Sequence, residues 1–231
     1  MKKSKLITLL IFLLVIPITL FLGTKIPGRG YYITGTLIII EMLIPFFLAF
    51  EGRRVQAREL VLLAVMCALA IVGRVAIPLP HFKAIFAIIM LTGIAFGPES
   101  GFMVGAIAAL ASNFFYGQGH YTPWQMMAYG AVGLLAGFCF RGKDPLKRNP
   151  WTMAIFGFLT VLFVAGPIMD CSGIFLMLSH ITLKTALLTL ASGMIYANLS
   201  QAICTAICIL LMGRPLLERL DRIQRKYGIM E

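Results

Sequence analysis

Residues 101–137 read GFMVGAIAALASNFFYGQGHYTPWQMMAYGAVGLLAG, and this stretch decides the fold. It contains no Lys, Arg, Asp or Glu, and two apolar segments flank one polar loop. A connector needs only a few residues of Gly, Pro or Ser. This loop instead carries Tyr116, Gln118, His120 and Tyr121, which can hydrogen-bond and stack. The stretch therefore predicts two membrane helices joined by a loop that can close over a bound molecule.

The composition of the whole chain supports a membrane protein. Of its 231 residues, 60% are hydrophobic and 13% are charged, with a mean hydropathy of +0.92. A soluble domain has about 45–50% apolar and 25% charged residues. The net charge of +11 would suggest nucleic acid in a soluble protein. Here the positions of the charges indicate membrane topology instead, and we expect a lipid bilayer rather than nucleic acid as the partner.

Apolar segments long enough to cross a bilayer need about 20 residues, and shorter ones fit inside a bundle. Eight spans are predicted near residues 6–23, 33–50, 60–77, 84–97, 101–115, 124–140, 151–169 and 194–213. The first span resembles a signal peptide but lacks a small-x-small cleavage pattern, so we expect an uncleaved helix. Residues 170–193 could extend the seventh helix, form a short surface helix or hold a re-entrant segment.

The positive charges predict the orientation. With a cytoplasmic N-terminus and eight crossings, fifteen Lys and Arg residues lie inside and four outside. The four outside are Lys25, Arg29, Lys83 and Lys184. This bias follows the positive-inside rule, so both termini are expected in the cytoplasm of a multi-pass plasma-membrane protein. Residues 78–83, 115–123 and 170–193 are then expected on the outer face.

Polar residues at the expected outer ends of the helices are candidate ligand contacts. Arg74 either snorkels to the surface or contacts an anion above a cavity. Asp170 either pairs with Arg74 or Lys184 or contacts the ligand. Helix-to-helix hydrogen bonds and an interfacial aromatic belt are the structural alternatives for the others. The full set of predicted substrate-binding residues is Arg74, His81, Asn113, Tyr116, Gln118, His120, Trp124, Gln125, Tyr129, Asp170, Tyr196, Asn198 and Gln201.

No enzyme or metal site is predicted. Cys204 and Cys208 share a helical face, but no His or carboxylate lies near them in sequence, so they are interpreted as packing residues. His81 and His120 lie in separate loops and are weak evidence for metal. The sequence has no HExxH, GxSxG or GxxxxGK[ST] motif. If ATP drives transport, another chain must supply the ATPase.

Residues 59–141, together with the ending ILLMGRPLLERLDRIQRKYG, resemble the substrate-binding S components of energy-coupling factor (ECF) transporters, which import vitamins. The resemblance rests on the order of GPESG, the glycine–aromatic loop and PWQM. It implies an all-α six-helix core at residues 57–231. The chain departs from the family at its start, where residues 1–56 are expected to add two transmembrane helices, 6–23 and 33–50. The resemblance also implies a ligand site at the outer face, closed by the three outer regions named above.

The resemblance further implies partners. A transmembrane coupling subunit would dock on a stripe of small residues, here Ala57, Ala64 and Ala68, where close helix approach is favoured. Two separate ATPases, which use ATP and Mg, would drive import as the S component topples in the membrane. The chain needs no cofactor of its own. The two added helices could cover part of this docking face.

The ligand is expected to be a vitamin-type molecule. TPWQM and the tail LLERLDRIQRKYG favour the cobalamin-type group, with riboflavin-, queuosine- or other heterocycle-binding members left open. A corrinoid needs a roomy pocket, which the small residues Gly105, Ala109, Gly130, Gly133 and Gly173 would permit. The alternative function is a stand-alone secondary permease for a small organic solute. It would show internal repeats and charged relays at the midplane. A non-transporting scaffold or an intramembrane enzyme is a third reading.

Overall fold

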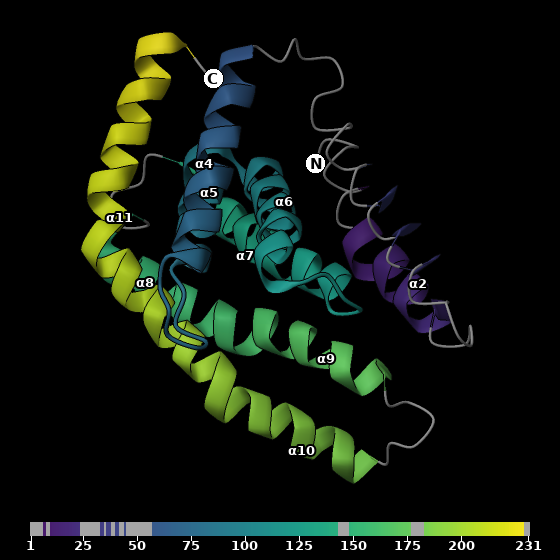
Figure 1. Cartoon of the computed structure of the whole chain (residues 1–231). Coiled ribbons are helices and arrows are strands. Elements are labelled where there is room, and N and C mark those ends of the chain that lie inside the picture. The colour runs from purple at the N-terminus through teal and green to yellow at the C-terminus, as the bar shows by residue number, and fades with distance from the viewer. Residues whose placement is uncertain are drawn as a thin grey trace.

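The fold is taken from a computed structural model of the chain (Figure 1). The structure describes Ile7, residues 10–23, seven residues between 33 and 44, and residues 57–142, 148–176 and 183–228. Every regular element in these residues is helical, which confirms the all-α prediction. The predicted span 33–50 is described only at the seven residues between 33 and 44, which are helical, and most of the predicted domain 1–56 lies outside the described residues. Within that domain, η1 (Ile11–Val15) continues into α2 (Ile16–Gly23).

The centre of the bundle is α5 (Ile85–Phe96), all twelve residues of which are buried. A helix that is apolar all round is stable only when other helices surround it. Here α4 (Ala57–Val75), α6 (Pro98–Tyr116), α7 (Thr122–Phe140) and α11 (Leu199–Tyr227) pack against it. α6 begins within GPESG, three residues before the predicted span 101–115, because Pro98 is its first residue and Glu99 lies in its first turn.

Glycines allow α5, α6 and α7 to approach at backbone distance. A Cβ added at Gly101 would lie 2.6 Å from the Gly93 Cα and from the Gly133 carbonyl oxygen. One added at Gly105 would lie 2.5 Å from the Tyr129 carbonyl oxygen. Gly105 and Gly133, expected to widen a ligand pocket, therefore serve helix packing instead, since neighbouring backbone already fills the space.

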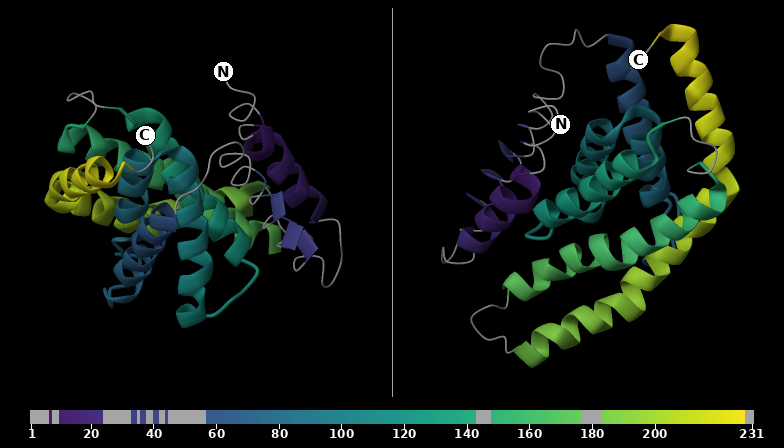
Figure 2. Two further views of the ribbon diagram at one scale, coloured as in Figure 1. Left: turned by 90° about the horizontal axis from the view of Figure 1, so that it is seen from above. Right: turned by 180° about the vertical axis from the view of Figure 1, so that it is seen from behind.

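Two long helices form the other part of the structure. α8 (Pro150–Thr160), η2 (Val161–Ala165) and α9 (Gly166–Leu176) make one continuous helix. α10 (Leu183–Gly193), η3 (Met194–Asn198) and α11 make the other. α9 and α10 run side by side in all views (Figures 1 and 2). Each helix contains one π-helical stretch, and the two stretches contact each other.

The structure decides between the alternatives for residues 170–193. Residues 170–176 extend the seventh predicted helix, and residues 183–193 belong to the start of the last one. Among the described residues of this region, neither a surface helix nor a re-entrant segment is formed. The predicted span boundaries 151–169 and 194–213 are therefore too short. Polar residues such as Asp170 and Lys184 made these segments look like loop in the sequence.

The surface of the bundle is apolar, as a lipid-facing surface is. α4 exposes Leu60, Val61, Val65, Leu69 and Val72, and further aliphatic side chains are exposed along α8 and α11. Such continuous apolar surface is rare on a soluble monomer. Two described helices, Pro150–Ile174 and Lys184–Tyr227, are long and apolar enough to cross a membrane. The number of crossings and the cytoplasmic position of the termini stay predictions.

Candidate functional site

A buried arginine lies at the centre of the candidate site. Arg74 is in the last turn of α4 and is only 8% exposed. Its Nη1 donates to the hydroxyl of Ser112 and to Asn113 Oδ1, the latter at 2.9 Å. Its Nη2 donates to Gln125 Oε1 at 3.4 Å. The fork of the guanidinium thus connects the end of α4 to the end of α6 and the start of α7.

Two tyrosine rings enclose the same guanidinium. The Arg74 Cζ lies 5.0 Å from the ring centroid of Tyr116 and 5.5 Å from that of Tyr129. At these distances the ring quadrupoles attract the cation. The Tyr116 hydroxyl also donates to the Arg74 carbonyl oxygen at 3.0 Å, which fixes the ring beside the end of α4.

Amide side chains fasten the polar loop onto this arginine. Asn113 Nδ2 donates to Gln125 Oε1 at 2.9 Å and to Thr122 Oγ1 at 3.1 Å. The Thr122 hydroxyl donates in turn to Gln118 Oε1 at 3.0 Å. Gln118 Nε2 donates to the Leu110 carbonyl oxygen at 2.9 Å. Gly117, at φ +94°, allows the chain to leave α6 in a conformation that other residues rarely adopt.

The arginine has neutral partners only. Within the part of the chain that the structure describes, no ion pair involves Arg74 or Lys83. The predicted snorkelling of Arg74 and its pairing with Asp170 are wrong, because the side chain is buried against Ser112, Asn113 and Gln125. Its predicted contact with an anion stays a prediction. A buried charge without a carboxylate is costly, so its hydrogen-bond donors favour an electron-rich ligand.

The loop at residues 78–83 supplies a second cation. Lys83 Nζ donates to the Ile77 carbonyl oxygen and lies 5.7 Å from the Tyr116 ring, which therefore contacts both Arg74 and Lys83. Gln201 Nε2 donates to the Lys83 carbonyl oxygen at 3.4 Å, which joins this loop to α11. Lys83 was predicted only as an outer charge, since a lysine beside a helix end usually reports topology.

A third polar group lies at the π-helical stretches. Asn198 Nδ2 donates to Asp170 Oδ2 at 2.7 Å. The predicted pairing of Asp170 with Arg74 or Lys184 is therefore wrong. Gly193 lies against this carboxylate, where a Cβ would approach Asp170 Oδ1 to 2.6 Å. Asn198 is buried, so the pair joins α9 to the last helix in the manner of an interhelical hydrogen bond.

The structure gathers six of the thirteen predicted site residues into one network. These are Arg74, Asn113, Tyr116, Gln118, Gln125 and Tyr129. The other seven lie outside it. Asp170 pairs with Asn198, Gln201 donates to the Lys83 carbonyl oxygen, and Trp124 is partly buried against the core. The ring centroid of His81 lies 5.8 Å from that of Tyr196, and the ring centroid of His120 lies 5.6 Å from that of Tyr121. A role in ligand binding stays a prediction for all thirteen.

Two members of the network were missed from the sequence. Ser112 precedes Asn113 by one residue, and Thr122 opens α7 three residues before Gln125. A helical spacing of three places Thr122 and Gln125 on one face, and this signal could have found Thr122. Ser112 is not distinguishable by sequence from the other small residues of α6.

The predicted docking stripe is accessible. Ala57, Ala64 and Ala68 of α4 are all exposed, and their spacing of seven and four places them along one side of the helix. They lie on a different face from buried Leu63, Met66 and Ala70, which pack into the bundle. The three alanines are therefore accessible on the surface of α4, and the docking role stays a prediction.

Comparisons with known proteins show which family this chain resembles. The model of the family described as ECF-type riboflavin transporter, S component, matches residues 54–220. A UPF0397 protein of Vibrio atlanticus (strain LGP32) is 30% identical over 118 residues, which is 48% of this chain. The chain spans 64% of that relative's length. No solved structure matches the chain. The expected cobalamin-type group is not supported, because the matching family is the riboflavin type.

Proposed function

Because this chain belongs to the family of S components of ECF-type riboflavin transporters, we propose that it is the substrate-binding subunit of such a transporter and that its ligand is riboflavin or a closely related flavin. The match over residues 54–220 is the observation that carries this proposal. It covers every residue of the Arg74 network. S components share a fold and differ in the residues around the ligand, so the flavin assignment needs its own test.

The chemistry of the Arg74 network supports a planar, carbonyl-bearing ligand. The guanidinium and the amides of Asn113, Gln118 and Gln125 offer donors and acceptors, which the carbonyl oxygens and ring nitrogens of an isoalloxazine can meet. Tyr116 presents an aromatic ring that is 47% exposed, and aromatic rings stack on planar heterocycles. A corrinoid would need a larger cavity than the closely packed middle parts of α6 and α7 leave around Gly105 and Gly133.

The proposed topology follows from the charge distribution. Both termini would lie in the cytoplasm and the Arg74 network at the outer face. The ligand would bind there, and a coupling subunit with two ATPases that use ATP and Mg would drive its import. In this arrangement residues 1–56 add two transmembrane helices to a six-helix core at residues 57–231.

Riboflavin binding by the purified chain tests the ligand. Riboflavin fluorescence should be quenched on titration with the detergent-solubilised protein, because aromatic side chains next to a bound flavin quench its fluorescence. The quenching should saturate at one flavin per chain. Cobalamin, followed by its visible absorbance on the same sample, should not bind. Binding of cobalamin without riboflavin would contradict the flavin assignment.

Uptake into liposomes tests the transport class. Riboflavin should accumulate only when the coupling subunit and both ATPases are reconstituted with this chain and ATP is supplied. Uptake by the lone chain would contradict the S-component role and favour a secondary permease. If the chain failed to bind flavin but supported ATP-dependent uptake of another vitamin, the flavin assignment would be wrong and the S-component role would stand.

Bulky residues on the alanine stripe should prevent assembly. Ala64→Leu and Ala68→Leu add side-chain volume where a partner helix must approach closely, and overpacking of this kind costs about 1–3 kcal/mol. Co-purification of the coupling subunit should fall roughly tenfold or more at such a cost. Flavin affinity of the isolated chain should stay within about twofold, since the stripe is remote from Arg74 along α4.

A matched control for this change is Ala191→Leu on α10, which is also an exposed alanine on a helix surface. It should leave co-purification unchanged. Normal assembly in both stripe variants would show that the coupling subunit docks elsewhere.

A further inference from the structure

A groove lies at the end of the bundle opposite the Arg74 network. The start of α4 and the end of α11 lie side by side there, next to the C-terminus (Figures 1 and 2). Between them is a cavity of about 370 Å³ lined by Ala57, Arg58, Val61, Leu62, Ile223 and Tyr227. Four of the six lining side chains are aliphatic, so the cavity suits a hydrocarbon chain.

Two cations lie beside the Tyr227 ring at the rim of this groove. The Arg58 Cζ lies 5.6 Å from the ring centroid of Tyr227, and the Lys226 Nζ lies 5.4 Å from the same centroid. Arg219, one turn before Ile223, is on the same face of α11 and is exposed. Like charges gathered on one surface repel each other, so an anion bound between them is favoured.

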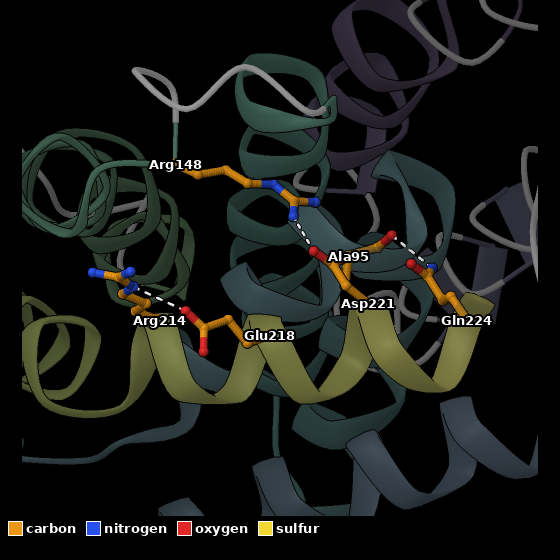
Figure 3. Close-up of polar contacts among 6 residues, drawn as sticks. All are labelled: Ala95, Arg148, Arg214, Glu218, Asp221 and Gln224. Carbon is orange, nitrogen blue, oxygen red and sulfur yellow. Dashed lines mark hydrogen bonds and ion pairs between the residues drawn. The ribbon is translucent and has the colours of Figure 1, made fainter. Parts of the chain in front are cut away.

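The two carboxylates of α11, Glu218 and Asp221, are engaged by arginines (Figure 3). Glu218 accepts from Arg214 at 2.9 Å, and Asp221 pairs with Arg148. Gln224 Nε2 donates to the Ala95 carbonyl oxygen of α5 at 2.9 Å. Among residues 57–142, 148–176 and 183–228, no ion pair involves Arg58 or Lys226. Within the described part of the chain, the positive charge of Arg58 and Lys226 at the rim is therefore not offset by an ion pair.

We propose that this groove binds one anionic phospholipid, with an acyl chain in the apolar cavity and the phosphate between Arg58 and Lys226. Basic pockets between transmembrane helices at the membrane surface are suited to anionic head groups. Because lipid tails and the cavity wall are equally apolar, the head group supplies the selectivity. The site is independent of the flavin proposal and of the direction in which the chain crosses the membrane.

A lipid fits these observations better than a protein segment does. Val61, in the groove wall, is 62% exposed on the apolar face of α4, where acyl chains contact the protein. The cations lie directly beyond this wall, at the helix ends, which is the level of the head groups. A helix from another subunit would have to bring its own carboxylate to this level.

Native mass spectrometry of the full chain tests the proposal. The detergent-solubilised protein is incubated with equal concentrations of phosphatidylglycerol and phosphatidylcholine, and the retained lipids are counted. One phosphatidylglycerol per chain should be retained, with about a tenfold preference over phosphatidylcholine, because phosphatidylglycerol has a net negative charge whereas the choline cation of phosphatidylcholine is repelled by the two protein cations. Equal retention of the two lipids would overturn the proposal.

Variants locate the lipid. Arg58→Gln combined with Lys226→Gln should abolish the preference, and Val61→Trp should reduce retention by filling the cavity while both cations remain. The control pair, Arg214→Gln with Arg225→Gln, removes two charges from the same tail outside the groove and should keep the preference. If the first pair lowers the yield of folded protein, Lys226→Gln alone should still reduce the preference about threefold.

Two outcomes would contradict the site. Full retention of phosphatidylglycerol by the Arg58/Lys226 pair would place the lipid elsewhere. Loss of coupling-subunit co-purification in that pair, with lipid retention unchanged, would identify the groove as a protein interface instead.

Discussion

Replacement of Arg74 by methionine is expected to reduce ligand affinity by at least about 100-fold. Methionine keeps much of the side-chain volume but leaves the oxygens of Ser112, Asn113 and Gln125 without their shared donor. Methionine also removes the N–H groups of the guanidinium that we propose the ligand accepts from, and each hydrogen bond to a charged group contributes about 1.5–3 kcal/mol. Every 1.4 kcal/mol changes affinity about tenfold. Two such hydrogen bonds to the ligand therefore account for the expected loss, which is measured by the riboflavin fluorescence titration.

Two further variants separate binding from folding. Arg74→Lys keeps the charge but loses the planar fork, so an intermediate loss is expected. Arg214→Met removes an arginine whose ion pair is exposed to solvent, and it should leave affinity unchanged. Each variant is checked by size-exclusion chromatography and thermal denaturation. Unchanged affinity in a folded Arg74→Met protein would show that the ligand binds away from this network.

Replacement of Gly101 by alanine is expected to destabilise the bundle strongly. The added Cβ would lie 2.6 Å from the Gly93 Cα and 2.6 Å from the Gly133 carbonyl oxygen. Both are backbone atoms, which cannot move aside by changing rotamer as a side chain can. Overpacking costs about 1–3 kcal/mol, and a clash with backbone on two helices belongs at the upper end of that range. The melting temperature of the solubilised chain should fall by about 6–12 °C.

Gly173→Ala is the matched control, because nothing lies within 4 Å of a Cβ added there. Gly173 is within α9, where alanine favours the helix by about 1 kcal/mol over glycine. Its melting temperature should therefore be equal to that of the unaltered chain or higher. Equal melting temperatures for Gly101→Ala and Gly173→Ala would show that α6 packs less closely against α5 and α7 than these distances indicate.

The sequence predicted the helices of the central bundle within a few residues. α5, α6 and α7 begin and end close to the predicted spans 84–97, 101–115 and 124–140. Apolar runs and the residues that interrupt them are local features, and Pro98 can begin a helix whatever surrounds it. Residues 170–193 were harder because polar side chains interrupt the apolar pattern there, while the helix continues through its packing against a neighbour.

The candidate site was predicted only in part, because the sequence shows which residues lie near helix ends but not which residues they contact. Arg74, Asn113 and Gln125 each lie near a helix end, and antiparallel helices bring such ends to one level of a bundle. Their level was therefore predictable, but their partners were not. Arg74 bonds to groups 38, 39 and 51 residues away in sequence. The choice of Asn198 rather than Arg74 for Asp170 depends in the same way on which helix lies beside α9.

By itself, the sequence determined that this chain is an apolar helical membrane protein with a polar loop at residues 117–121, because hydropathy and glycine or proline positions act over a few neighbouring residues. The tertiary structure decided what the individual residues do. It assigned Gly101 and Gly133 to helix contact, enclosed Arg74 among neutral oxygens and tyrosine rings, and placed both Arg58 and Lys226 beside the Tyr227 ring. These outcomes depend on distances between segments far apart in the chain, which only the packing of the helices sets.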